Sequence, residues 1–258
     1  MKSGLKYSRI AGIFLCLVFS VSAAETNVVK KLPRTVVPVA QNAKWTTTWW
    51  VPRHEEKVRR IKRGNVDLLM IGDSITHGWE TRGKAVWNTY YKNRKAVNLG
   101  FSGDRTEHVL WRLQHGEIDG ISPRLVVLMI GTNNTGQKQK DSAQDTAAGI
   151  QAILKELRTR LPRTRVLLLG VFPCAATAES PLRKVNDQIN EIISGYADNK
   201  RVFYLNINKK FLDENGILSK EIMPDLLHPN EKGYQIWAKA MEPTISRLIS
   251  RTPLNPSD

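Results

Sequence analysis

One stretch decides the fold of this chain: Val66-Asp67-Leu68-Leu69-Met70-Ile71-Gly72-Asp73-Ser74-Ile75-Thr76-His77-Gly78-Trp79. Its first half is a short apolar run, which is typical of a strand buried on both faces. The run stops at Gly72-Asp73-Ser74, three residues that favour turns. A serine exposed where a buried strand ends is how an α/β fold presents a nucleophile. Taken alone, the tripeptide is equally compatible with an ordinary turn.

Further apolar runs predict four more strands, at 96–98, 125–130, 166–171 and 202–205. Helical patterns lie between and around them, with apolar residues three or four positions apart. They cover 52–62, 142–157 after a cap at Asp141 or Ser142, 185–196, and a last helix from Asn230 that we expect Pro243 to kink. Strands that alternate with helices predict a parallel sheet with both faces covered, which is an α/β fold.

The N-terminus has the pattern of a signal peptide. Lys2, Lys6 and Arg9 precede an apolar run over 10–21, and small residues end it at Ser22-Ala23-Ala24. The run is too short to span a bilayer. We therefore expect residues 1–24 to be a signal peptide cleaved near Ala24, and the protein to be periplasmic or secreted. The stretch 25–44 has two prolines and no periodicity, which predicts a linker before a single domain over 45–258.

Charge and cysteine content narrow the functional classes. Loss of the three basic residues of the signal lowers the formal net charge from +15 to +12. The excess is scattered, without an aromatic-interleaved patch or a helix-turn-helix pattern, so we expect no nucleic-acid partner. A weak attraction to anionic polymers or membrane surfaces is the remaining expectation. Cys16 leaves with the signal, so the mature chain keeps only Cys174 and can form no internal disulfide.

Polar motifs follow the predicted strands, where ligands of a parallel sheet bind. They are Gly72-Asp73-Ser74, Asn98-Leu99-Gly100-Phe101-Ser102-Gly103-Asp104, Gly131-Thr132-Asn133-Asn134 and, near the C-terminus, Asp225-Leu226-Leu227-His228-Pro229-Asn230. Each alone is also ordinary for a turn or a helix start. Together, in this order and at one sheet edge, they predict a single site.

The residue types at this edge suit ester cleavage by a serine. A serine hydroxyl needs a base to take its proton, and a carboxylate usually orients that base. Asp225 and His228, three apart, can supply this pair to Ser74 if their loop folds back. The oxyanion that attack creates needs fixed donors. We expect them to be the backbone N–H groups of Ser74 and Gly103 and the side-chain amide of Asn133.

These motifs resemble the SGNH (GDSL-type) hydrolases, whose serine, glycine, asparagine and histidine would be Ser74, Gly103, Asn133 and His228. The stretches NLGFSGDRTEHVLWRL (98–113) and GTNN (131–134) further resemble the catalytic subunits of the intracellular platelet-activating-factor acetylhydrolases, over roughly residues 50 to 250. The resemblance implies a three-layer fold with a five-stranded parallel sheet in the order 2-1-3-4-5. The chain departs from those subunits in its signal peptide, in Ser102 where they have glycine, and in His77-Gly78.

Three functional hypotheses follow. In the resembled acetylhydrolases the residues after the serine and before the histidine close the acyl pocket, and here both are bulky, Ile75 and Leu227. The first hypothesis is a secreted esterase for short acyl groups, with acetyl on carbohydrate preferred, because the resembled family includes many exported bacterial carbohydrate esterases. The second is a lipid acetylhydrolase or lysophospholipase, and the third is an inactive module that binds glycans.

The remaining histidines predict no cofactor. We expect His54 to be solvated on its basic helix, and His108 and His115 to pack or face solvent beside Trp111. His77 is a candidate substrate contact because it lies next to the nucleophile. Five scattered histidines give no zinc spacing, and phosphate-loop and dinucleotide-binding glycine motifs are absent from the sequence. We therefore expect activity without a metal or a cofactor, so that a chelator leaves turnover unchanged.

Overall fold

The structure is a computed structural model that describes Met1 and residues 32–136 and 139–255. The expected signal peptide and the first part of the expected linker lie outside these residues, so both stay predictions. The contacts within the chain group Leu32–Asp258 into one compact unit. The fold described below is that of this unit.

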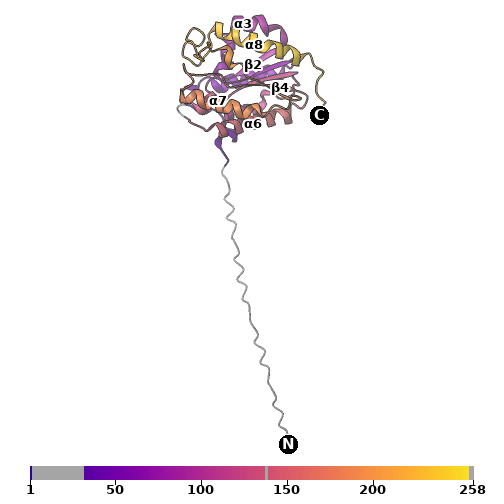
Figure 1. The fold of residues 1–258 in the computed structure, drawn as a ribbon. Helices are drawn as coiled ribbons and strands as arrows, with labels where there is room; N and C mark the ends of the chain where they lie inside the picture. The colour runs from indigo at the N-terminus through magenta and orange to yellow at the C-terminus, as the bar shows by residue number, and fades with distance from the viewer. Residues whose placement is uncertain (2–31, 137–138, 256–258) are drawn as a thin grey trace. The chain divides into compact units, whose positions relative to one another are not determined.

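Five parallel strands form one sheet in the order β2-β1-β3-β4-β5 (Figure 1). Their bounds are Leu68–Gly72 (β1), Ala96–Gly100 (β2), Leu125–Met129 (β3), Arg165–Leu169 (β4) and Val202–Leu205 (β5). This confirms the predicted α/β fold and its strand order. The order puts β1 in the middle of the first three strands, so the segments that follow β2 and β3 lie on either side of the segment that follows β1.

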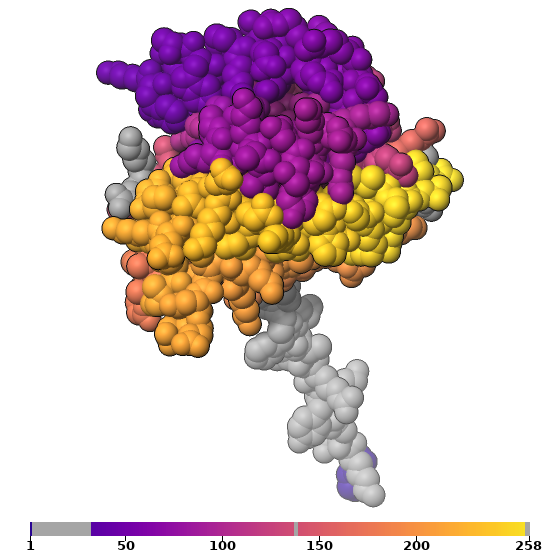
Figure 2. Space-filling view, turned by 90° about the horizontal axis from the view of Figure 1, so that it is seen from above, coloured from indigo at the N-terminus to yellow at the C-terminus, as the bar shows by residue number. Residues whose placement is uncertain are grey.

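Alternate side chains of β1 enter two separate cores, because successive residues of a strand face opposite ways. Leu68 and Met70 pack beneath the helices α3 (Lys84–Tyr90) and α8 (Glu231–Ile249). Leu69 and Ile71 pack in the second core, with residues of α6 (Ala143–Arg160) and α7 (Pro181–Ser194). Figure 1 shows these pairs of helices on opposite faces of the sheet. In Figure 2, which looks onto the first pair, yellow α8 lies beside the purple residues of α3.

The longer helices begin where the sequence predicts caps. The Ser142 hydroxyl accepts a hydrogen bond from the backbone N–H of Asp145 at 3.0 Å and so caps α6. Asn230 caps α8 in the same way, through the N–H of Gly233 at 3.1 Å. α8 continues as one helix past Pro243, where the sequence predicts a kink. Helix α3, by contrast, has no counterpart among the predicted elements.

The remaining elements are short apart from α1, and several position the site. They are η1 (Arg34–Val36), η2 (Lys44–Thr46), α1 (Trp50–Lys62), α2 (Ser74–His77), η3 (Gly78–Glu80), η4 (Lys92–Arg94), α4 (Thr106–Arg112), the π-turn η5 (Leu113–Glu117), α5 (Thr132–Thr135) and η6 (Asn208–Lys210). Within the described ranges, no helix has the length and apolar character that crossing a membrane requires.

The segment 32–44 packs on the domain, although the sequence predicts a linker there. Thr35 is fully buried, and its hydroxyl donates to the carbonyl of Asp145 at 2.6 Å. Arg34 donates to both carboxylate oxygens of Asp141, at 2.9 and 2.6 Å. These contacts come from polar side chains on a single 3-10 turn, which leaves no apolar periodicity in the sequence. The folded domain thus includes residues on the N-terminal side of Trp45.

Candidate active site

The end of β1 turns Ser74 out of the sheet. Gly72 closes the strand where any side chain would collide with its neighbours, since a Cβ there would lie 2.4 Å from the carbonyl oxygen of Met129. Asp73 follows, fully buried, and its Oδ1 accepts the backbone N–H of Ile75 at 2.9 Å, which caps α2. Ser74 is therefore the first residue of a short helix and is partly exposed at the carboxyl edge of the sheet.

His228 and Asp225 reach Ser74 from the loop before α8. The Oγ of Ser74 lies 2.8 Å from Nε2 of His228, and Nδ1 of His228 lies 2.6 Å from Oδ2 of Asp225. The other oxygen of Asp225 accepts the backbone N–H groups of Leu227 and His228, at 3.1 and 2.7 Å. Partial burial raises the pKa of Asp225, but the hydrogen bonds from His228 outweigh it and leave the pKa below its usual value. The carboxylate therefore stays charged and can orient the imidazole.

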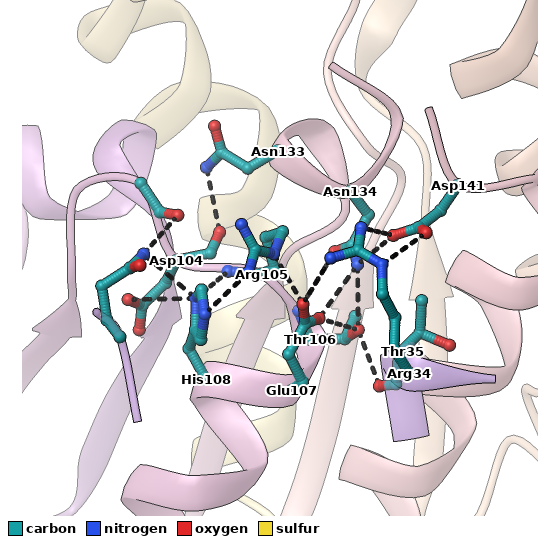
Figure 3. Close-up of polar contacts among 12 residues, drawn as sticks. Arg34, Thr35, Asp104, Arg105, Thr106, Glu107, His108, Asn133, Asn134 and Asp141 are labelled. Atoms are coloured by element: carbon teal, nitrogen blue, oxygen red, sulfur yellow. Dashed lines mark hydrogen bonds and ion pairs between the residues drawn. The ribbon is translucent and has the colours of Figure 1, made fainter. Parts of the chain in front are cut away.

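The expected oxyanion donors lie on loops that contact each other. Gly103 adopts a φ of +78°, in the left-handed region that favours glycine. The Asn133 amide donates to the carbonyl of Asp104 at 2.9 Å, which ties the loop after β3 to the loop after β2 (Figure 3). Within the part of the chain that the structure describes, the second N–H of that amide has no acceptor. Within the described residues, neither Ser74 nor Gly103 donates its backbone N–H to another backbone group.

A pocket of about 440 Å³ adjoins the triad on the side of β3 and β4. Asn133, Asp225 and Leu227 line it, together with Thr132, Thr135, Gly136, Cys174, Ala175, Leu182 and Leu226. Ile75 is not among the lining residues; it is 1% exposed and packs in the core. Leu227 lines this pocket and Ile75 does not, and the expectation that both residues close the acyl pocket remains a prediction. Burial raises the pKa of the free Cys174 thiol to about 11, so the thiol stays protonated.

A buried ionic network supports the loop that carries Gly103. Arg112, with no exposed surface, donates from Nε to Oδ2 of Asp104 at 2.7 Å and from a terminal nitrogen to Glu117. Oδ1 of Asp104 accepts the indole N–H of Trp50 at 2.7 Å. Burial raises the pKa of Asp104 to about 6, and the charge of Arg112 limits the rise. The Asp104 carbonyl that receives Asn133 is therefore fixed through its own side chain.

His54 belongs to this network, so its predicted solvation is wrong. It is buried, and its Nδ1 lies 2.9 Å from Oε1 of Glu117. The buried residues of α1 are Trp50, His54, Lys57 and Ile61, which recur every three or four positions. That spacing marks one helix face and could have revealed the burial. The many basic residues of α1 concealed it.

A second polar network joins the N-terminal segment to the same loops (Figure 3). Asn134 accepts the backbone N–H of Thr106 at 3.0 Å and donates to Oε2 of Glu107 at 3.2 Å. Arg34 reaches Glu107 at 3.3 Å from the N-terminal side. His108 is buried among these groups, and burial together with Arg105 lowers its pKa to about 3. It is a neutral structural residue, as the sequence suggests.

His77 contacts Ser102. Both residues differ from those of the resembled acetylhydrolases, so two of the sequence differences lie side by side in the structure. Nδ1 of His77 is 3.0 Å from the Ser102 hydroxyl. Burial, followed by the charge of Arg53, lowers the pKa of His77 to about 4, so its ring is neutral near pH 7. Its contact with a substrate remains a prediction.

The buried carboxyl of Asp73 should make stability depend on pH. Burial is the main cause that raises its pKa to about 7, and the neighbouring charge of Asp104 adds to it. Within the described residues its Oδ2 has no hydrogen-bond partner. The unfolded chain releases this proton near its ordinary value of 3.8, so the folded state alone keeps it between about pH 4 and pH 7. The contribution to stability is therefore complete below pH 4 and is lost as pH rises towards 7.

We expect Asp73→Asn to remove this pH dependence. Relative to the variant, the wild type should lose on the order of 3 kcal/mol of unfolding free energy between pH 4 and pH 7.5. Urea unfolding of both proteins at these two pH values measures the difference. A difference that stays constant over this range would show that Asp73 is ionised throughout.

Comparisons with known proteins agree with this geometry. The model of the GDSL-like Lipase/Acylhydrolase family matches residues 70–236. Platelet-activating factor acetylhydrolase IB subunit alpha1 of Homo sapiens is 33% identical over 206 residues, which cover 78% of this chain and 85% of that protein. Subunit alpha2 of Rattus norvegicus is 32% identical over 205 residues, which cover 79% and 86%.

Solved structures share the fold at lower identity. A GDSL-like lipase from Bacteroides thetaiotaomicron aligns with a TM-score of 0.59 and 22% identity, over 76% of this chain and 97% of that one. Axe2, an acetylxylan esterase from Geobacillus stearothermophilus, aligns with a TM-score of 0.55 and 21% identity, over 72% and 94%. Within the described ranges, no three His, Cys, Asp or Glu residues are grouped so that they could hold a metal ion. The chain belongs to the GDSL-like (SGNH) lipase/acylhydrolase family and is a carboxylic ester hydrolase.

Proposed function

We propose that this protein is an exported serine esterase that removes short acyl groups, chiefly acetyl, from carbohydrate. One observation carries the catalytic part of the proposal. Ser74, His228 and Asp225 form a continuous hydrogen-bonded chain, with contacts of 2.8 and 2.6 Å. This is the arrangement in which a base activates a hydroxyl and a carboxylate orients the base.

The reaction proceeds in two halves. Ser74 Oγ attacks the acyl carbon while Nε2 of His228 takes its proton, and Asp225 stabilises the imidazolium. The N–H groups of Ser74 and Gly103 and the amide of Asn133 stabilise the oxyanion. His228 returns the proton to the departing alcohol, which leaves an acyl-enzyme. Water, activated by the same histidine, then releases the acid and restores Ser74.

Two considerations support acetyl and carbohydrate as the substrate groups. Among the relatives named above, the sequence relatives are acetylhydrolases and one of the two solved structures is an acetylxylan esterase, so these names specify acetyl, whereas the other structure is a GDSL-like lipase. The predicted signal peptide would deliver the enzyme to a compartment where polymeric glycans are accessible. Edman sequencing of the exported protein checks the second point, with a mature chain that begins at Glu25 expected.

A lipid acetylhydrolase or lysophospholipase is the second candidate. The pocket of about 440 Å³ beside the triad favours it, because leucines at 182, 226 and 227 give the lining an apolar character. A broad apolar pocket would accept a long acyl chain. The third hypothesis, an inactive glycan-binding module, would be marked by loss of the serine, asparagine or histidine, and all three are present.

Acyl-chain length separates the first two candidates. For a short-acyl esterase we expect kcat/KM to fall from 4-nitrophenyl acetate to butyrate and to be close to zero with octanoate. Each methylene changes the activation free energy by about 1–3 kcal/mol, so the decline is graded. Equal values for acetate and octanoate would exclude the short-acyl proposal and favour the lipid one.

Leu227 and Ile75 provide a matched pair for this measurement. Leu227→Ala should shift the preference towards butyrate, because the residue lines the pocket without lying in the core. Ile75→Ala should instead lower the unfolding free energy, by about 2–5 kcal/mol, because the side chain fills the core. A shift in acyl preference caused by Ile75→Ala alone would reverse this assignment.

A further inference from the structure

Two tryptophans form an open aromatic surface at the N-terminal side of the site. Trp45 is 54% exposed, and its ring centre lies 5.8 Å from that of the half-buried Trp49. The Trp49 ring lies 5.9 Å from the ring of His77. We call these three rings the aromatic shelf. An exposed tryptophan against the expected oxyanion glycine, Gly103, requires an explanation, because burial of such a side chain is strongly favourable.

The aromatic shelf is held rigidly by its own backbone. The indole N–H of Trp49 donates to the carbonyl of Trp45 at 3.1 Å, which fixes one ring against the other residue. The Thr46 hydroxyl donates to the carbonyl of Ala43 at 2.7 Å and closes the η2 turn. Gln41, which is buried, accepts two backbone N–H groups of this turn and donates to the carbonyl of Gly103 at 3.1 Å. The rings are therefore preorganised before any ligand arrives.

The Trp45 ring also lies directly against the expected oxyanion glycine. A Cβ on Gly103 would be 2.4 Å from the Trp45 ring, so only glycine leaves room for the tryptophan there. The shelf is thus anchored to the loop after β2, whereas the pocket lined by Leu227 lies beside the segments after β3 and β4. In the sheet order, β1 and its Ser74 stand between these two sides.

This arrangement divides an ester between two subsites. The acyl and alcohol groups leave the carbonyl carbon in different directions, and the carbonyl oxygen is fixed by the oxyanion donors. If the acyl group enters the pocket beside Leu227, the alcohol group extends towards the aromatic shelf. The alcohol part therefore meets two tryptophan faces.

The chemistry of the shelf favours a sugar ring over a lipid chain. A pyranose ring has an apolar C–H face that stacks on an indole and hydroxyls that stay in contact with water. An open surface suits such an amphipathic ring, whereas a lipid tail needs a site that encloses most of its surface. Near pH 7 the three rings carry no formal charge, since His77 is neutral. Tryptophan faces also bind quaternary ammonium groups, so the test includes acetylated lipids as the competing substrate.

We infer that Trp45 and Trp49 bind the pyranose ring that carries the scissile acyl group. This inference rests on the proposed function and specifies the alcohol part of its substrate. It assigns the residues from η2 to the start of α1, which hold both rings, a direct role in substrate recognition.

The test compares two acetate esters that differ only in their alcohol. One is a mono-O-acetylated methyl β-xylopyranoside, and the other is ethyl acetate, which has no ring. Trp45→Ala and Trp49→Ala should each lower the ratio of kcat/KM for the pyranoside over ethyl acetate by about tenfold, mainly through KM. Trp45→Phe, which keeps an aromatic face, should restore most of the ratio. Val51→Ala removes an exposed apolar side chain outside the shelf and should leave the ratio unchanged.

The outcomes separate this inference from the proposed function. A wild-type enzyme that cleaves neither acetate contradicts the proposed function itself. A wild-type enzyme that cleaves both, with the ratio unaltered in Trp45→Ala and Trp49→Ala, overturns the shelf alone. Equal losses on both esters would assign Trp45 only a supporting contact with Gly103. If Trp45→Ala and Trp49→Ala lowered kcat/KM only on micellar acetylated lipids, the ligand of the shelf would be a lipid. This result would also overturn the inference.

Discussion

Alanine at Ser74 or at His228 is expected to reduce kcat for 4-nitrophenyl acetate by at least about 10⁴-fold. The serine variant loses the atom that forms the acyl-enzyme. The histidine variant keeps that atom but loses the base 2.8 Å away, and an unassisted serine hydroxyl is a weak nucleophile at neutral pH. The double variant should be no slower than either single one, because both residues act in the same step.

Two matched substitutions control this experiment. Ser194→Ala and His115→Ala remove the same side chains at exposed positions, at the end of α7 and after α4, and should retain full activity. Neither catalytic variant should change the fold, since both side chains sit at the partly exposed edge of the sheet. Near-wild-type activity in Ser74→Ala, with the fold intact by circular dichroism, would identify another nucleophile and end the triad assignment.

The fold was predictable because its elements have simple sequence periodicities. The five strands are short apolar runs separated by helical patterns, and parallel strands require such crossovers. The strand order and the roles of the site residues came from the motif resemblance as well, since alternation alone does not rank the strands. Ser74, Gly103 and Asn133 were accessible to prediction because each follows a strand at the edge where ligands bind, whereas Asp225 and His228 lie in the loop before α8 and were identified by their motif.

The buried ionic network that supports the active site was not predictable in the same way. Arg112 and Glu117 are charged, and charged residues are almost never fully buried unless they are paired. Asp104 lies eight positions before Arg112, but His54 is 63 positions from Glu117, and no local pattern specifies that these four side chains meet. Polar side chains on a basic helix are ordinarily solvated, so the sequence predicts the wrong environment for His54.

The N-terminal segment was missed for a related reason. Thr35 and Gln41 attach it through hydrogen bonds to the domain, and Trp45 packs on a glycine rather than in a hydrophobic core. Contacts of this kind leave neither a two-residue nor a 3.6-residue period. The aromatic shelf is therefore visible only once the loop after β2 and the turn before α1 are brought together.

Asp225→Asn is expected to lower kcat by about 10²–10⁴-fold, less than the loss of Ser74 or His228. The asparagine can still accept the backbone N–H groups of Leu227 and His228 through Oδ1, so the loop should hold its shape. Its amide nitrogen, however, would point an N–H at Nδ1 of His228, where Oδ2 of the aspartate now lies 2.6 Å away. The imidazole must then carry its proton on Nε2, the atom that has to accept the proton of Ser74.

The exposure of Asp225 sets the size of this effect. Its side chain is 54% exposed, so water can compete for Nδ1 and let part of the population keep the active tautomer. We therefore expect the loss to fall below that of a buried triad carboxylate. Glu221→Gln is the control for the loss of one negative charge near the site. Its side chain belongs to the same loop and is 79% exposed. If Asp225→Asn matched this control in kcat, the carboxylate would have no part in orienting His228, and another group, such as a backbone carbonyl, would have to hold the imidazole.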